Sequence, residues 1–210
     1  MENHSENFAT AMRPASPLVS FMPPKPVVLV GLMGCGKTSI GKRLAKRLDL
    51  PFCDSDQEVE VAAGCSVQDI ESFFGEGALQ SGEYKVLDRL LNQQTQVIAT
   101  GCLSFTYPTT MELIKKNSIS VWLDASLSIL SVRLSGRKER VLFHNGQVVD
   151  FDDEAVLKSM IDTYNPMFQN ADVVVQTQDE SANITVDRVI IAISEFIKTT
   201  YPDYHVLKSV

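Results

Sequence analysis

The sequence predicts an α/β fold, a three-layer αβα sandwich built on a five-stranded parallel sheet. Short apolar runs rich in β-branched residues alternate with longer stretches of helical periodicity, a glycine-rich loop joins the first run to the first helix, and no internal repeat appears. Strands that alternate with helices of this length are joined by right-handed crossovers. The strands therefore run parallel, and helices cover both faces of the sheet.

The first strand, loop and helix are the most distinct unit of this pattern. Residues 26–30 form an apolar run that stops at Gly31, which is typical of a buried parallel strand. From Lys37 onward, apolar residues recur at helical spacing until Pro51 ends the element. The further strands are expected at residues 51–53, 96–100, 119–123 and 171–175, and the further helices at 56–61, 66–74, 82–92, 110–116, 127–134, 153–168 and 182–198.

Length and composition limit the classes of protein that fit. A chain of 210 residues with 44% hydrophobic residues fits one domain, expected over residues 27–200, with a flexible N-terminal tail at 1–26 and a C-terminal tail at 201–210. The net charge of −7 argues against nucleic acid or an anionic membrane as a partner. No apolar run approaches the roughly 20 residues that span a bilayer. We expect a cytoplasmic monomer that acts on a small molecule.

The cysteines and histidines indicate neither a disulfide framework nor a zinc site. The four cysteines show no C-x-x-C pairing, so we expect free thiols in a reducing compartment. We hypothesise that Cys35 and Cys102 face each other, and a Cα separation beyond about 7 Å would exclude a disulfide between them. The three histidines lie far apart in the sequence, without ligand spacing.

A phosphate-binding motif occupies residues 31–38, which read GLMGCGKT and fit G-x-x-x-x-G-K-[ST]. Its glycines permit backbone angles at which successive N–H groups turn toward an anion, and the following helix adds the positive end of its dipole. Lys37 supplies an ammonium group for the β- and γ-phosphates of ATP, and the Thr38 hydroxyl is a ligand for Mg²⁺. We expect the nucleotide to contact Gly34, Cys35, Gly36, Lys37, Thr38 and Ser39.

Residues 31–45, GLMGCGKTSIGKRLA, closely resemble the opening of shikimate kinases. The resemblance continues in family order over about residues 27–175. The further matches are Phe52-Cys53-Asp54-Ser55-Asp56, Gly75-Glu76 ahead of Glu83, Val97-Ile98-Ala99-Thr100-Gly101, Arg140 and Ala171-Asp172.

The resemblance implies transfer of the γ-phosphoryl group of ATP to a hydroxyl of shikimate, in a nucleoside-monophosphate-kinase-like fold with a lid at about residues 135–150. It places Asp54 in the metal shell through water, and it gives Asp56 the task of orienting the acceptor hydroxyl and taking its proton. Arg140 matches the lid arginine that reaches the phosphates, and Arg133 matches an arginine that packs on adenine. Lys37, Asp56 and Arg140 are then the catalytic residues.

Each of these residues also has a structural interpretation. An Asp after a strand commonly caps a helix, which explains Asp54 and Asp56 without catalysis. Arg133 and Arg140 flank a polar basic stretch that solvent alone would accommodate.

The acceptor side departs from the family pattern. The family binds the shikimate carboxylate with two further arginines and a glycine triplet. In this sequence the two arginines are replaced by Gln80 and Tyr164, and the place of the triplet is taken by Gly101-Cys102-Leu103. The residue after Arg140 is Val141 where the family has proline. Each lost charge-assisted hydrogen bond costs about 1.5 to 3 kcal/mol. The expected acceptor contacts are Asp56, Gln80, Gly101 and Tyr164.

Three functions remain compatible with the sequence. The first is a divergent shikimate kinase in which Lys42, Arg137 or a partner supplies the missing charge. The second is a kinase of a different, less anionic hydroxylated metabolite. The third is a non-catalytic ATP-binding module, which the retention of Asp56 disfavours.

Overall fold

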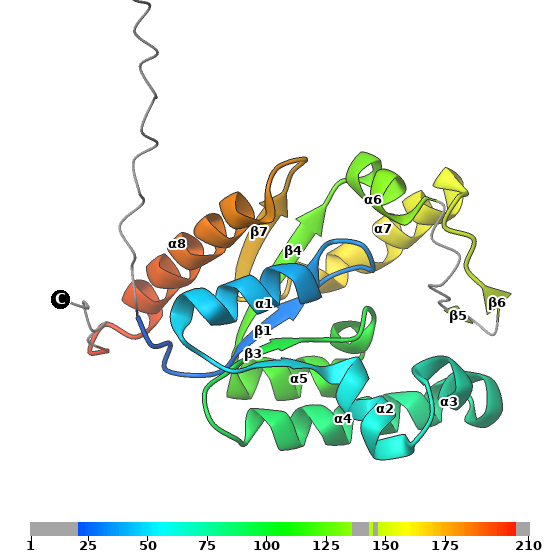
Figure 1. Cartoon of the computed structure of the whole chain (residues 1–210), viewed down its shortest axis with the longest axis horizontal. Coiled ribbons are helices and arrows are strands. Elements are labelled where there is room, and N and C mark those ends of the chain that lie inside the picture. Colours follow the sequence, from blue (N-terminus) through cyan, green and yellow to red (C-terminus); the bar gives the residue numbers. More distant parts are fainter. Residues whose placement is uncertain (1–20, 136–142, 145–146, 205–210) are drawn as a thin grey trace, which may run out of the picture.

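The computed structural model describes residues 21–135, 143–144 and 147–204. Its centre is a five-stranded sheet in the order β2-β3-β1-β4-β7, in which every neighbouring pair is parallel (Figure 1). The predicted fold class is therefore confirmed. The strands are β1 (Val27–Val30), β2 (Phe52–Asp54), β3 (Val97–Ala99), β4 (Ile119–Ala125) and β7 (Val173–Thr177).

Burial along the strands follows their place in the sheet. All four residues of β1 are fully buried, and so are the three residues of β3. Strand β7 lies at the edge and alternates buried and exposed residues. Continuous apolar runs thus mark the strands that helices cover on both faces.

Helices lie on both sides of the sheet. α1 (Lys37–Leu48) and α8 (Ala182–Thr200) pack side by side on one face, and α4 (Glu76–Leu91), α5 (Pro108–Asn117) and α7 (Glu154–Phe168) lie on the other (Figure 1). On this second face the Phe168 ring stacks on Phe105 and on Trp122, with ring centroids 6.3 and 6.0 Å apart. The remaining helical elements are α2 (Ser55–Ala63), α3 (Val67–Phe74), the 3-10 turn η1 (Ser104–Thr106) and α6 (Leu127–Leu134).

Helix α4 begins earlier than the sequence predicts. The expected start was residue 82, but the helix begins at Glu76, directly after Gly75 with φ 84°. Gly77 and Gly82 weaken the intrinsic helix propensity of this segment, and contacts with α2, α3 and α5 override that weakness. The early start places Gln80 on the same helix as Glu83.

The packed part of the chain reaches beyond residues 27–200 at both ends. Phe21 is only 2% exposed and belongs to the hydrophobic core. The Tyr204 hydroxyl donates a hydrogen bond of 2.7 Å to the carbonyl oxygen of Met22, which joins the two ends of the described chain.

The region expected to form the lid contains a small second sheet. β5 (Phe143–His144) and β6 (Gln147–Val148) pair antiparallel. Arg140 lies outside the described residues, as do Arg137 and Val141. Among the helices of the described ranges, none has the length and apolar character needed to cross a membrane.

Candidate active site

The glycine-rich loop after β1 has the backbone of an anion-binding turn. Gly31, Gly34 and Gly36 have φ values of 134°, 84° and 107°, in the region that side chains rarely adopt. At Gly31 a side chain would also come within 2.9 Å of the Leu123 carbonyl oxygen. Gly36 is the N-cap of α1, so the loop leads directly into a helix N-terminus.

The Lys37 side chain folds back over this loop. Its ammonium group donates hydrogen bonds of 2.6 Å to the Gly31 carbonyl and 3.1 Å to the Leu32 carbonyl. Carbonyl oxygens are weak partners for an ammonium group compared with phosphate oxygens. An arriving phosphate group can therefore compete for Lys37 at little cost.

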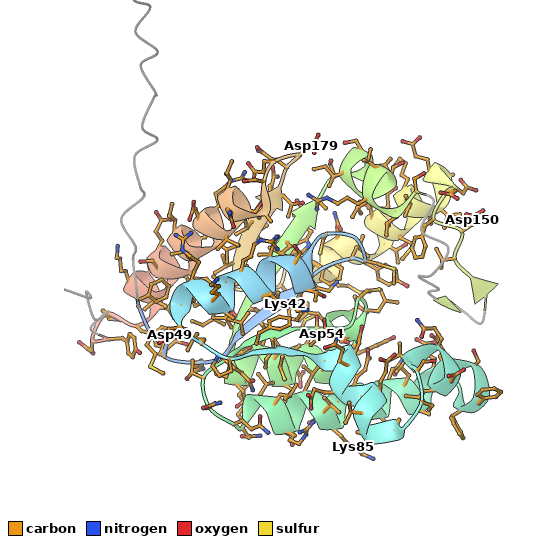
Figure 2. The ribbon with its side chains drawn as sticks, in the orientation of Figure 1. Lys42, Asp49, Asp54, Lys85, Asp150 and Asp179 are labelled. Carbon is orange, nitrogen blue, oxygen red and sulfur yellow. The ribbon has the colours of Figure 1, made fainter. Side chains whose placement is uncertain are left out.

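Two oxygen donors suited to a divalent cation meet beside the loop. The Thr38 hydroxyl donates a hydrogen bond of 2.9 Å to Asp54 Oδ2. Asp54 ends β2, and its other carboxylate oxygen accepts from the backbone N–H of Asp56 at 3.3 Å, which caps α2. Figure 2 labels Asp54 at this junction between β2 and α2. Asp54 thus caps a helix and also reaches the phosphate-binding loop.

The donor set near Thr38 fits Mg²⁺ better than a metal held by protein alone. Within the described ranges, no group of three or more His, Cys, Asp or Glu side chains could hold a metal ion. Mg²⁺ usually takes one or two protein oxygens and completes its shell with phosphates and water. Thr38 and Asp54 satisfy that smaller requirement.

A cleft of about 850 Å³ connects these groups. It runs from the phosphate-binding loop to the N-terminus of α8 on one side and to α2 on the other. The predicted site residues that line it are Gly34, Gly36, Lys37, Thr38, Ser39, Asp54, Asp56 and Arg133. Cys35 does not, because its side chain is fully buried beneath the loop.

Arg133 on α6 ties the phosphate-binding loop to the segment after β7. Its guanidinium group donates to the carbonyl oxygens of Cys35 at 3.2 Å and Gly34 at 3.4 Å, and to that of Gln178 at 3.2 Å. Arg188 of α8 forms an ion pair with Glu180 in the same region, and Glu180 lines the cleft. Arg133 therefore has protein partners in this structure, and a solvated basic stretch does not describe it.

Asp56 occupies the other end of the cleft. The pKa of its carboxyl is raised to about 6, chiefly because of burial and also because of the neighbouring Asp54 charge, while the Lys37 charge acts in the opposite direction. A carboxyl group with this pKa is still mostly ionised at neutral pH and can accept a proton.

Gln80, Gly101 and Tyr164, which were expected as acceptor contacts, are not among the residues that line this cleft. Gly101 donates its backbone N–H to the Ser55 hydroxyl at 3.1 Å, and Gln80 donates to Glu76 at 2.9 Å. Tyr164 on α7 is 7% exposed, and burial raises the pKa of its hydroxyl. Of this neighbourhood, Thr100 and Cys102 line the cleft itself. Burial raises the pKa of the Cys102 thiol to about 12, so it remains protonated.

A second carboxyl near Asp56 was not identified as a site residue from the sequence. Glu83 is 6% exposed, and its Oε1 accepts a hydrogen bond of 2.9 Å from the Ser104 hydroxyl. The sequence does carry a signal for its burial, because Glu83 falls on the helical face of Val86, Leu87 and Leu90. Its neighbours across the fold are visible only in the structure.

All four cysteines are free thiols, as the sequence predicts. Cys35 is buried, and the other three are partly exposed.

These features define the class of P-loop phosphotransferases. They are the parallel sheet, the glycine-rich loop between β1 and α1, and the Lys37, Thr38 and Asp54 groups around one cleft. Ligands of such sheets bind outside the carboxyl ends of the strands, and β1, β2 and β3 all end at this cleft.

Comparison with known proteins narrows the class to a family. The shikimate kinase family model matches residues 33–195. A shikimate kinase from Paramagnetospirillum magneticum is 41% identical over 185 residues, which cover 88% of this chain and 92% of that protein. One from Caulobacter vibrioides is 39% identical over 171 residues, covering 81% and 83%. The chain belongs to the shikimate kinase family.

Solved structures agree with this assignment. The shikimate kinase from Acinetobacter baumannii in complex with shikimate superposes with a TM-score of 0.72 at 27% identity, covering 81% of this chain and 93% of that one. A gluconokinase from Sinorhizobium meliloti has a TM-score of 0.55 at 18% identity, covering 87% and 98%, which shows a shared fold only.

Proposed function

We propose that this protein transfers the γ-phosphoryl group of ATP to a hydroxyl group of shikimate. One observation carries the proposal. A single cleft joins the phosphate-binding loop and Lys37 to Asp56, a carboxyl group suited to accept a proton. Family membership and the relative solved with shikimate favour this acceptor.

Lys37 and the loop amides hold the triphosphate in this proposal. The ammonium group leaves the Gly31 and Leu32 carbonyls and binds the β- and γ-phosphate oxygens, where it offsets the charge that moves during transfer. Thr38 and Asp54 are the residues that would hold Mg²⁺. When bound, the ion would supply positive charge that neutralises part of the charge on the phosphates.

Asp56 orients the attacking hydroxyl and takes its proton. Its position at the start of α2, opposite Lys37, suits a hydroxyl in line with the γ-phosphate. Arg133 packs against the adenine ring, and Arg140 reaches the transferring phosphoryl group from the lid. Gln80, Gly101 and Tyr164 shape the wall behind the acceptor. We also propose that the protein works as a monomer in the cytoplasm, without nucleic acid or membrane partners.

A second acceptor class has an observation in its favour. The described cations of the cleft, Lys37, Lys42, Arg43 and Arg133, lie on α1 and α6. The described residues on the opposite, acceptor side are acidic or uncharged: Glu76, Gln80, Glu83, Cys102 and Tyr164. A carboxylate is held best by bidentate arginine contacts. A hydroxylated metabolite with less negative charge than shikimate would fit this wall at lower cost.

An ADP-release assay separates these alternatives. The purified protein is given MgATP with shikimate as the sole acceptor, and Lys37→Met serves as the blank. Lys46→Met is the matched control, because Lys46 is an exposed residue of the same helix outside the cleft. Shikimate-dependent ADP release by the wild type and Lys46→Met, but not by Lys37→Met, supports the proposal. Turnover that appears only with uncharged hydroxylated acceptors would favour the second class.

A further inference from the structure

Helix α4 turns one carboxyl group toward the interior of the domain. Glu83 is the only Asp, Glu, Lys or Arg among the buried polar residues of the described ranges. It receives one hydrogen bond, from the Ser104 hydroxyl, and it takes part in none of the ion pairs that the described residues form. A buried carboxylate that forms no ion pair is strongly disfavoured and takes up a proton instead.

Glu83 and Asp56 approach each other across Gly101. A β-carbon placed on Gly101 would lie 2.5 Å from Glu83 Oε1, 2.7 Å from Asp56 Oδ1 and 2.7 Å from Ser104 Oγ. The two carboxyl groups, one from α2 and one from α4, therefore converge on the same side of one Cα atom. The bond from the Gly101 N–H to Ser55 fixes the loop in this place. Two carboxyl groups this close together do not both ionise at neutral pH.

The groups that face Glu83 from the surrounding elements reinforce this state. Asp56 of α2 and Glu71 of α3 are acidic, and the Cys102 thiol and the Tyr107 hydroxyl are neutral groups with raised pKa values. Lys37 is the nearby cation, and it acts on Asp56 and Cys102. The pKa of Glu83 is raised to about 8, chiefly because the carboxyl is buried and also because of the Asp56 charge, while the Ser104 hydrogen bond acts in the opposite direction.

We propose that Glu83 is a positioning residue for phosphoryl transfer. As a neutral carboxylic acid it holds the Gly101 loop in place, and Asp56 remains the only charged carboxyl group of the pair beside the acceptor. This inference rests on the proposed function, because it assigns Asp56 to the acceptor hydroxyl. When Glu83 loses its proton, a second negative charge appears beside Asp56 and close to the acceptor. Repulsion then displaces the Asp56 carboxylate and the loop, and catalysis slows.

The pH profile of catalysis tests this role. kcat/KM for shikimate is measured at saturating MgATP from pH 6 to pH 10 for the wild type, Glu83→Gln and Asp88→Asn. Gln imitates the protonated carboxyl in shape and charge, and Asp88 is an exposed acid of the same helix. The wild type and Asp88→Asn should lose activity above about pH 8, by about tenfold per pH unit. Glu83→Gln should match the wild type at pH 7 and lack this alkaline fall.

Two results would overturn the inference. One is an alkaline fall in Glu83→Gln identical to that of the wild type. The other is a loss of more than about tenfold at pH 7, which would mean that the ionised carboxylate is required. If the role of Glu83 were purely structural, Glu83→Gln would lower kcat/KM by the same factor at every pH.

A second measurement needs no turnover. Carbon-13 labelling of the glutamate side-chain carboxyls gives one resonance that disappears in Glu83→Gln. We expect that resonance to titrate near pH 8, and titration near the ordinary glutamate value would refute the proton assignment. If the wild type does not phosphorylate shikimate, the proposed function fails, while this titration still decides whether Glu83 is neutral.

Discussion

Gly101→Ala is the most informative single substitution in the acceptor half of the cleft. The backbone of Gly101 does not have a positive φ, so alanine meets no conformational barrier there. The added methyl group would instead lie 2.5 to 2.7 Å from the side-chain oxygens of Glu83, Asp56 and Ser104. Such contacts are too short for carbon and oxygen, so the loop or the two carboxyl groups must move.

The size of the effect follows from that crowding. Overpacking of a well-filled interior costs about 1 to 3 kcal/mol, which lowers the melting temperature of a protein of this size by about 2 to 4 °C per kcal/mol. A displacement of a catalytic group by about 1 Å can reduce the rate by about 100-fold. We expect kcat/KM for shikimate to fall by about 10- to 100-fold, with the Kd for MgATP unchanged because the phosphate-binding loop keeps its geometry.

The assays are ADP release with shikimate, calorimetric titration with MgATP and a thermal melt. Gly77→Ala is the matched control, because a β-carbon on Gly77 meets nothing within 4 Å. It should retain wild-type kinetics and melt at the same temperature or higher, since alanine favours the helix more than glycine. A Gly101→Ala protein with wild-type stability and wild-type kcat/KM would refute the crowded arrangement around Gly101.

Three further substitutions test separate parts of the structure. The pKa of Glu83 rises from 4.5 to about 8 on folding, so the folded protein holds an extra proton between these values and loses up to ~1.4 kcal/mol of stability per pH unit as pH rises. Glu83→Gln should remove this loss. If the melting temperature falls by the same amount from pH 5 to pH 8 in the wild type and in Glu83→Gln, the assigned pKa of Glu83 is wrong. Arg133→Gln removes the hydrogen-bond donors to the carbonyl oxygens of Gly34, Cys35 and Gln178. It should raise the Kd for ATP, measured by calorimetry, by about tenfold. The surface variant Arg89→Gln is the control. Asp172→Ala removes the acceptor of two bonds from Ser120 and should cost about 2 to 3 kcal/mol in a denaturant titration, whereas Asp162→Ala, at an exposed ion pair, should cost less than about 1 kcal/mol.

The sheet and most helices could be predicted because each carries a local signal. The apolar run 26–30 gives β1, and the periodic stretch 127–134 gives α6 at the same bounds as in the structure. The start of α4 was wrong, because Gly77 and Gly82 suggest a break and only packing against neighbouring helices keeps the segment helical. The turn η1 was missed, since three residues of 3-10 helix leave no periodic pattern.

The nucleotide half of the candidate site was predictable for a similar reason. Lys37 and Thr38 belong to one contiguous motif. Asp54 and Asp56 come to it from the carboxyl end of β2, a parallel strand that is separated from β1 by β3. The sequence allowed Asp54 both to cap a helix and to serve the phosphate site, and in the structure it caps α2 and accepts a hydrogen bond from Thr38 at the same time.

The acceptor half depends on contacts between distant elements. The partners of Glu83 come from α2, from η1 and from the loop after β3, and no spacing in the sequence relates them. Helical periodicity reveals that Glu83 is buried, but it cannot identify Asp56 or Ser104 as its neighbours.

We propose above all that the cleft beside Lys37 and Asp56 moves a phosphoryl group from ATP to shikimate. Phosphorus-31 NMR of the protein with MgATP and shikimate tests it most directly, because the product is observed rather than inferred from ADP. We predict that a new phosphomonoester resonance grows in step with ADP and is absent with Lys37→Met. An unchanged ATP spectrum, or ATP loss that yields only inorganic phosphate, would contradict the claim.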